Sequence, residues 1–144
     1  MDNVLHRIKV NLYPNLLTED PNDYSARVIS ERTLSISDIC RTAISRGGAQ
    51  TSTSAQAMES NVALFLKEMA YQLCDGFSVN TGYFTANTQL RGVFNSSKET
   101  YNPEKHTILF QFNQGELLRK ELGNVSVVID KVGEAMLVIE EVYD

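Results

Sequence analysis

Residues 106–122, His-Thr-Ile-Leu-Phe-Gln-Phe-Asn-Gln-Gly-Glu-Leu-Leu-Arg-Lys-Glu-Leu, predict a strand that turns directly into a helix. Ile108, Phe110 and Phe112 occupy alternate positions, which is the period of a strand with one face against a core. Asn113 offers a side-chain acceptor to the first N–H groups of a helix, and Glu116 completes a capping box. A chain built around this joint is expected to combine helices with a sheet.

Length and composition limit the class of protein. The 144 residues suit one domain with a terminal extension, and 42% of them are apolar, enough for an ordinary core. No apolar run approaches the ~18 residues of a membrane span. The first six residues lack the charged and apolar regions of a signal peptide, so we expect a cytoplasmic protein.

The charge of the chain is unevenly distributed. The net charge of −5 does not favour binding to a polyanion. Residues 124–144, however, hold one lysine against five acids, whereas residues 36–123 hold eight basic and eight acidic side chains. The acidity therefore lies mainly in the C-terminal tail, and the central region is neutral.

The N-terminal section, residues 4–34, predicts two strands. Residues 6–13 and 24–33 alternate between apolar and polar side chains, and Asp20-Pro21 between them is typical of a turn.

Two helices are expected next. Ser35 and Asp38 begin the first, which ends at Gly47-Gly48, and Thr53 or Ser54 caps a longer helix that Asp75-Gly76 ends. The longer helix carries an apolar stripe of Met58, Val62, Phe65, Leu66, Met69 and Leu73. This stripe is too large for one short partner helix, so a sheet or a second subunit must cover the rest. Cys40 and Cys74 are expected to be buried on the apolar faces of the two helices.

After Gly76 the period changes from that of a helix to that of a strand. A strand is expected from Phe77 through a bend at Thr81-Gly82 to Val93-Phe94, followed by a polar arm over residues 95–105. Beyond the strand-helix joint, which Gly123-Asn124 ends, residues 125–129 and 136–139 predict two further strands joined at residues 131–133.

This order of elements from Ile36 to Leu122 resembles that of the histone-like HU and IHF proteins. Phe112, Gly115, Leu118 and Arg119 match the closing motif of that family, and Gly82-Tyr83 matches the start of its Gly-Phe-Gly-x-Phe pattern. The N-terminal strands make the chain most similar to a divergent bacterial HU-related group, in which an immunoglobulin-like domain often follows. The resemblance implies an α+β fold of HU/IHF type with an N-terminal β extension over 1–34, an HU/IHF-like domain over 35–123, and C-terminal strands or the start of a following domain over 124–144.

Two departures from the family pattern concern the parts that bind DNA. Phe84 and Ala86 replace the second glycine and the final phenylalanine, and the arm is short. HU and IHF insert a proline from the arm tip between base pairs. Pro103 lies only five residues before Ile108, which favours a plain turn over a wedge.

The resemblance implies a homodimer that binds duplex DNA with little sequence specificity. The residues expected to contact phosphates are Arg91, Lys98, Lys105, Arg119 and Lys120. Glu99 and Glu104 in the arm oppose such contacts. The alternative is a protein-interaction or scaffold module that keeps the dimer and has lost strong DNA binding.

No enzyme motif is present in the sequence. His6 and His106 are far apart along the chain, and each suits a surface or packing role. There is no phosphate-binding glycine loop, no metal-spaced Cys/His cluster and no nucleophile motif. We therefore expect no catalytic residues, metal, cofactor, small-molecule substrate or membrane partner.

Overall fold

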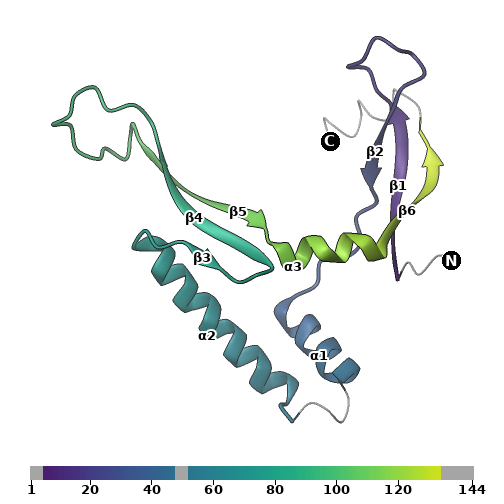
Figure 1. Ribbon diagram of the computed structural model, residues 1–144, viewed down its shortest axis with the longest axis horizontal. Helices are drawn as coiled ribbons and strands as arrows, with labels where there is room; N and C mark the ends of the chain where they lie inside the picture. The colour runs from purple at the N-terminus through teal and green to yellow at the C-terminus, as the bar shows by residue number, and fades with distance from the viewer. Residues whose placement is uncertain (1–4, 48–51, 134–144) are drawn as a thin grey trace. The chain divides into compact units, whose positions relative to one another are not determined.

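The computed structural model describes residues 5–47 and 52–133 and confirms a mixed α+β protein. Its helices and two three-stranded sheets are coloured along the chain in Figure 1. The chain divides into two compact units, one formed by the described parts of residues 1–32 and 120–144, the other by residues 33–119. Each unit has its own sheet.

The first unit is built on a sheet with strand order β2-β1-β6. Its strands are β1 (His6–Pro14), β2 (Tyr24–Val28) and β6 (Val125–Val132). β1 pairs antiparallel with β2 and parallel with β6, with a register shift between Val10 and Asn11. The predicted turn is confirmed, since the Asn22 N–H donates to the Asp20 carboxylate at 2.9 Å.

The ends of two strands differ from prediction. β2 ends at Val28 rather than Thr33, because its pairing with β1 stops where Val28 faces Val10. β6 runs through Val132, which pairs with Leu12, so residues 131–132 are strand and not the predicted turn. The strand predicted over residues 136–139 lies outside the described residues.

The first two helices of the second unit begin and end at the predicted signals. α1 (Ile36–Gly47) starts with a reciprocal pair in which the Asp38 N–H donates to Ser35 Oγ and the Ser35 N–H donates to Asp38 Oδ2. α2 (Ala55–Cys74) is capped by Ser54, whose Oγ accepts from the Ala57 N–H at 3.1 Å. Asp75 ends α2, and Gly76 follows with a φ of 90°, where glycine is favoured.

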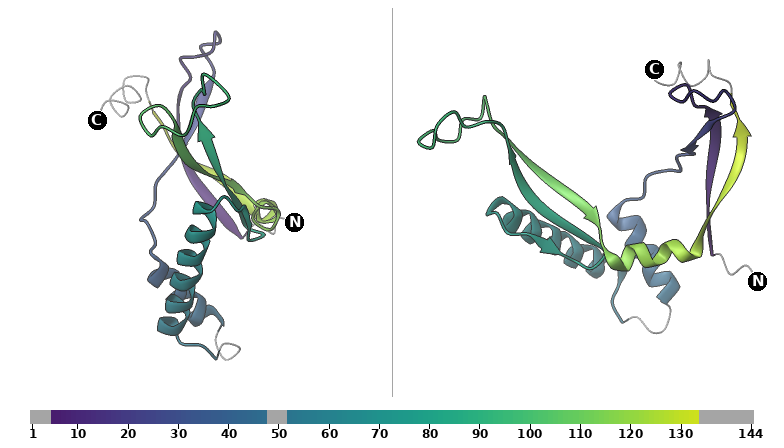
Figure 2. Two further views of the ribbon diagram at one scale, coloured as in Figure 1. Left: turned by 90° about the vertical axis from the view of Figure 1, so that its left-hand side faces the viewer. Right: turned by 45° about the horizontal axis from the view of Figure 1, so that its top comes forward.

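The sheet of the second unit has the order β3-β4-β5, with both pairs antiparallel. Its strands are β3 (Val79–Asn80), β4 (Phe84–Arg91) and β5 (Thr107–Gln114). The end of α2 packs against this sheet (Figure 2). Thr88 Oγ1 donates to the Leu73 carbonyl at 2.5 Å. β4 ends at Arg91, short of the predicted Val93-Phe94, because Gly92 with a φ of 123° turns the chain away.

The predicted capping box at Asn113 is wrong. Asn113 lies inside β5, paired with Thr85, and α3 (Glu116–Arg119) begins three residues later. Pairing with β4 holds the strand to Gln114, and the N–H groups of Gly115 and Leu117 donate to the carbonyls of Tyr83 and Gly82 instead. A 3-10 helix over Lys120–Asn124 continues from α3, so the predicted stop at Gly123-Asn124 is confirmed.

One of the two predicted buried cysteines is exposed. Cys40 is 3% exposed and belongs to the small core of the second unit with Leu73 and Ala86. Cys74, at the last position of α2, is exposed. Its neighbours on the sheet leave an open hollow, described below, rather than a packed interior.

Substituting Gly115 with alanine is expected to destabilise the second unit by about 1–3 kcal/mol, the usual cost of overpacking. An added Cβ would lie 2.3 Å from the Gly82 carbonyl oxygen, which is backbone and cannot move independently. Urea unfolding followed by circular dichroism measures the change. Gly123→Ala is the matched control, because nothing lies within 4 Å of its added Cβ. Equal stability of the two variants would contradict the close packing of Gly115 against the Gly82 backbone.

Candidate nucleic-acid interface

The sheet of the second unit separates a polar face from an apolar face. Side chains alternate between the faces along each strand, and the β4–β5 register places paired residues on the same face. The polar face carries Thr85, Asn87, Gln89, Arg91, Thr107, Leu109, Gln111 and Asn113. The apolar face carries Phe84, Ala86, Thr88, Leu90, Ile108, Phe110, Phe112 and Gln114.

Amide side chains dominate the polar face. Gln89 Nε2 donates to Gln111 Oε1 across the two strands, and Asn87 is the Cα partner of Gln111. Each amide offers both a donor and an acceptor, so this face can bond phosphate oxygens and base edges without carrying net charge. Arg91 is the one cation among the β4 and β5 residues of this face.

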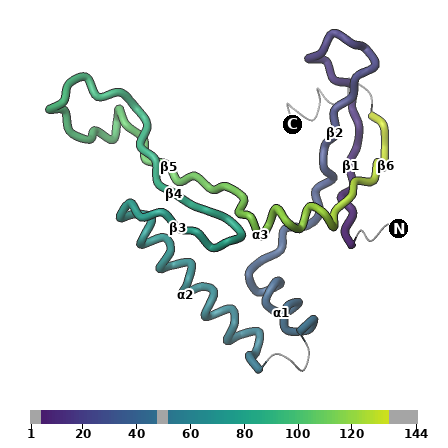
Figure 3. The backbone as a smooth tube through the Cα atoms, viewed as in Figure 1, coloured from purple at the N-terminus to yellow at the C-terminus, as the bar shows by residue number. Residues whose placement is uncertain are grey.

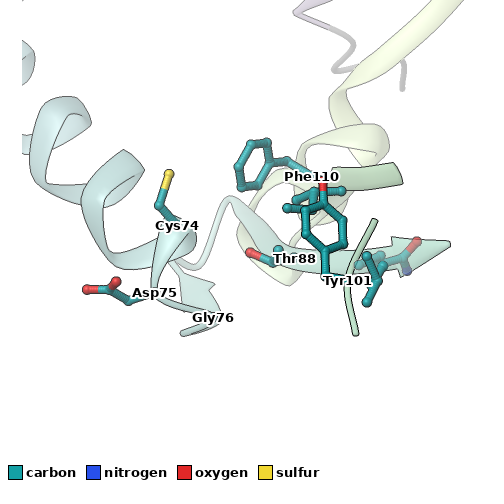
Figure 4. A pocket seen from close by; sticks show the side chains of 9 residues that line it. Cys74, Asp75, Gly76, Thr88, Tyr101 and Phe110 are labelled. Atoms are coloured by element: carbon teal, nitrogen blue, oxygen red, sulfur yellow. The ribbon is translucent and has the colours of Figure 1, made fainter. Parts of the chain in front are cut away.

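The apolar face is only partly covered within the chain. Leu90, Ile108, Phe110 and Phe112 are each about half exposed, at 51%, 51%, 47% and 55%. An open hollow of about 610 Å³ lies between this face, the end of α2 and Tyr101 of the arm. Figure 4 shows Phe110, Thr88 and Tyr101 around it, with Cys74 and Asp75 on the helix side.

The arm forms a loop between β4 and β5 (Figure 3). His106, at the end of the arm, is 1% exposed. Its Nδ1 accepts from the Asn102 N–H at 3.0 Å, and its Nε2 lies 3.0 Å from the Val93 carbonyl oxygen. A carbonyl oxygen only accepts, so Nε2 is the ring nitrogen that donates, while Nδ1 accepts. Phe94 stacks on the ring with centroids 3.8 Å apart. His106 is therefore a packing residue that closes the arm, as one of its two predicted roles allowed.

Pro103 lies in a tight turn within the arm. The N–H groups of Lys105 and His106 both donate to the Asn102 carbonyl, and the Glu104 N–H donates to the Asn102 side chain. These bonds enclose Pro103 in a plain turn, the interpretation that the sequence favoured.

The arm cations differ in their surroundings. Lys105 forms an ion pair with Glu99, whereas Lys98 is exposed. Glu99 Oε1 also accepts from the Asn95 N–H at 2.6 Å. The hydrogen bond from Lys105, and then that from Asn95, holds the pKa of Glu99 below its ordinary value of 4.5. Much of the charge of Lys105 is thus already balanced within the arm.

The structure places three of the five predicted contact residues together. Arg91 is exposed at the end of β4 that leads to the arm, where Lys98 and Lys105 lie. Arg119 ends α3, which follows β5 at the other end of a strand about 26 Å long. Lys120 begins the 3-10 helix and belongs to the first unit.

Comparison with known proteins identifies the family. A family model for an HU-type DNA-binding domain matches residues 7–132. The chain belongs to the HU-like DNA-binding domain family. The resemblance seen in the sequence is therefore confirmed, and the match extends into the strands on both sides of the region that first suggested it.

One solved structure shares the fold of this HU-like chain. It is the crystal structure of a protein from Bacteroides vulgatus that is named as a candidate bacterial DNA-binding protein. The two chains share 21% sequence identity, and their structures match with a TM-score of 0.71. The similarity covers 89% of this chain and 50% of that one, so this chain spans about half the length of its structural relative.

A comparison with curated proteins finds no match. Of the helices that the structure describes, none combines the length and hydropathy that crossing a membrane requires.

The amide-rich face of this HU-like chain was not predicted from the sequence, because only cations were considered as phosphate contacts. Its signal is nevertheless present, because Thr85, Asn87, Gln89 and Arg91 follow one another at every second position. The same period on β5 gave the apolar residues that were recognised. Reading both sides of each strand would have found the polar face.

The lowered pKa of Glu99 predicts an acid-sensitive arm. A carboxyl with a lower pKa in the folded arm stabilises the arm above pH 4.5, and this contribution is lost as the pH falls through the lowered value. The Asn95 amide resonance should therefore shift with a midpoint below 4.5 in an NMR titration. Glu99→Gln should abolish that transition, whereas the arm control Glu104→Gln should keep it. A midpoint at or above 4.5 would contradict the bonding seen here.

Proposed function

We propose that this chain binds duplex DNA with little sequence specificity, as a homodimer of the HU/IHF arrangement, through residues 35–123. The observation that carries the proposal is the amide-rich polar face of β4 and β5, next to Arg91 and Lys98, on a member of an HU-like DNA-binding family. Amides and a few cations suit contacts to the backbone and to the degenerate minor-groove edge more than a sequence code.

The charge of the site indicates how tightly DNA would be held. Each phosphate contact by a cation releases counterions and makes binding weaken with salt. Lys105 is ion-paired, and the polar face offers Arg91 as its cation, so few such contacts are available in this unit. We expect this unit by itself to contribute modest affinity with a shallow dependence on salt.

Exposed apolar side chains support the homodimer. On α2, Leu64 and Phe65 are 68% and 52% exposed, and the apolar sheet face is half open. Covering a large apolar side chain stabilises a complex by about 2 kcal/mol. A second copy that covers these surfaces would complete the core that one chain leaves small.

The alternative function is a scaffold or protein-interaction module on the same dimer. The ion pair between Glu99 and Lys105 favours it, since it removes an arm cation that DNA would need.

DNA binding is tested by fluorescence anisotropy with a duplex of about 30 base pairs, roughly three helical turns. Affinity should fall between about 50 and 200 mM salt, and Lys98→Glu should weaken binding and reduce the slope of log K against log salt by about one. Gln111→Ala should weaken binding with an unchanged slope, because an amide contact releases no counterion.

Lys67→Glu on α2 is the charge-matched control and should bind as the wild type does. No binding by the wild-type chain at about 50 mM salt would exclude the DNA function and favour the scaffold.

The homodimer is tested by analytical ultracentrifugation. The wild-type chain should sediment with twice its mass of 16.1 kDa, and Phe65→Glu should shift it to the single-chain mass, because a buried charge would disrupt the interface. Lys67→Glu, two residues further along α2, should remain dimeric. A wild-type monomer throughout the micromolar range would contradict the proposal.

A further inference from the structure

The sheet of the first unit also has two unlike faces. Val10 of β1 is paired with Val28 on one side and Ile129 on the other, and Ile8 is paired with Val127. Leu12 pairs with Ala26 and Val132 in the same way. From Ile8 to Leu12, one face of the β2-β1-β6 sheet is therefore apolar.

The opposite face is basic. Arg7 and Lys9 alternate with the apolar residues of β1 and so lie on its other side, together with Asn11. Asn11 pairs with Arg27 on β2 and with Lys131 on β6. Arg7, Lys9, Arg27 and Lys131 thus share one surface, here called the basic strand face.

An aromatic ring anchors this surface. Tyr13 is 8% exposed, and the guanidinium carbon of Arg27 lies 5.4 Å from its ring centroid. Gly133 packs directly against the ring, where an added Cβ would lie 2.3 Å from Tyr13. Arg27 is therefore held in place over a packed ring, while Lys9 and Lys131 are exposed.

Acidic residues are few on the strands of this sheet. Asp130, at the register shift, is the one acid within the described strands β1, β2 and β6. Glu19, Asp20 and Asp23 lie in the loop that joins β1 to β2. Over the described residues of this unit, 5–32 and 120–133, six basic and six acidic side chains balance, but the strand pairing places four of the cations on one face.

The spacing of the cations suits a phosphate backbone. Arg7 and Lys9 lie about 6.6 Å apart along β1, and neighbouring strands lie about 4.8 Å apart. Duplex DNA carries one charge for about every 1.7 Å of its axis, so a surface of this size meets several phosphates. The basic strand face adds the exposed Lys9 and Lys131 to the cations of the arm.

We propose that the basic strand face is a second contact surface for the phosphates of duplex DNA, outside the region that resembles HU. The inference rests on the proposed DNA-binding function. It assigns most of the counterion release that accompanies DNA binding to the basic strand face. Its partner is the sugar-phosphate backbone, which the cations recognise by charge and not by base sequence.

The test uses the full chain with Lys9→Gln and Lys131→Gln combined, in the anisotropy assay over a series of salt concentrations. Losing two phosphate contacts should lower affinity and reduce the salt slope by about 1.8. The matched control combines Arg46→Gln and Lys67→Gln, which removes the same charge from α1 and α2 and should leave the slope unchanged. Circular dichroism and sedimentation should be the same for both double variants.

The outcomes separate the two proposals. If the wild-type chain binds and both double variants keep its slope, the second surface is excluded while the DNA function stands. If the wild-type chain does not bind duplex DNA at any salt concentration, both proposals fail. Tighter binding to single-stranded RNA than to duplex DNA, dependent on Lys9 and Lys131, would overturn duplex DNA as the partner.

Discussion

The joint between β5 and α3 holds the β4–β5 register in the sheet of the second unit. That register determines which side of the sheet each residue occupies. Gly115 approaches the β3–β4 turn closely, and its N–H donates to the Tyr83 carbonyl at 2.7 Å while Leu117 donates to Gly82 at 3.0 Å. These bonds fix the end of β5 against the start of β4. A slip of one residue would exchange the polar and apolar faces. The separation of an amide-rich surface from a half-exposed apolar surface depends on this contact.

The proposed function divides DNA binding between two kinds of surface. The polar face offers hydrogen bonds with little charge, and His106 and the ion pair of Glu99 close the arm from within. In the proposal, the basic strand face supplies the charge that phosphates require. A local group of cations would then serve a member of a DNA-binding family whose net charge is −5.

Local signals were readable from the sequence, whereas long-range pairing was not. Ser35, Ser54 and Gly76 mark helix ends through bonds to residues within four positions, so their prediction was correct. Asn113 was misread because pairing with distant Thr85 outcompeted a local cap. The basic strand face depends on the pairing of β6 with β1, which are more than 100 residues apart in the sequence. No local sequence pattern predicts such pairing.

The most direct test of the account is amide chemical-shift mapping by NMR as duplex DNA is added to the full chain. The account predicts shifts at Gln111 and Asn113 on the polar face, at Lys98 in the arm, and at Lys9 and Lys131 on the basic strand face. The amide resonances of Leu64 and Phe65 on α2 should stay unchanged. Shifts confined to α2, or none at saturating DNA, would contradict it.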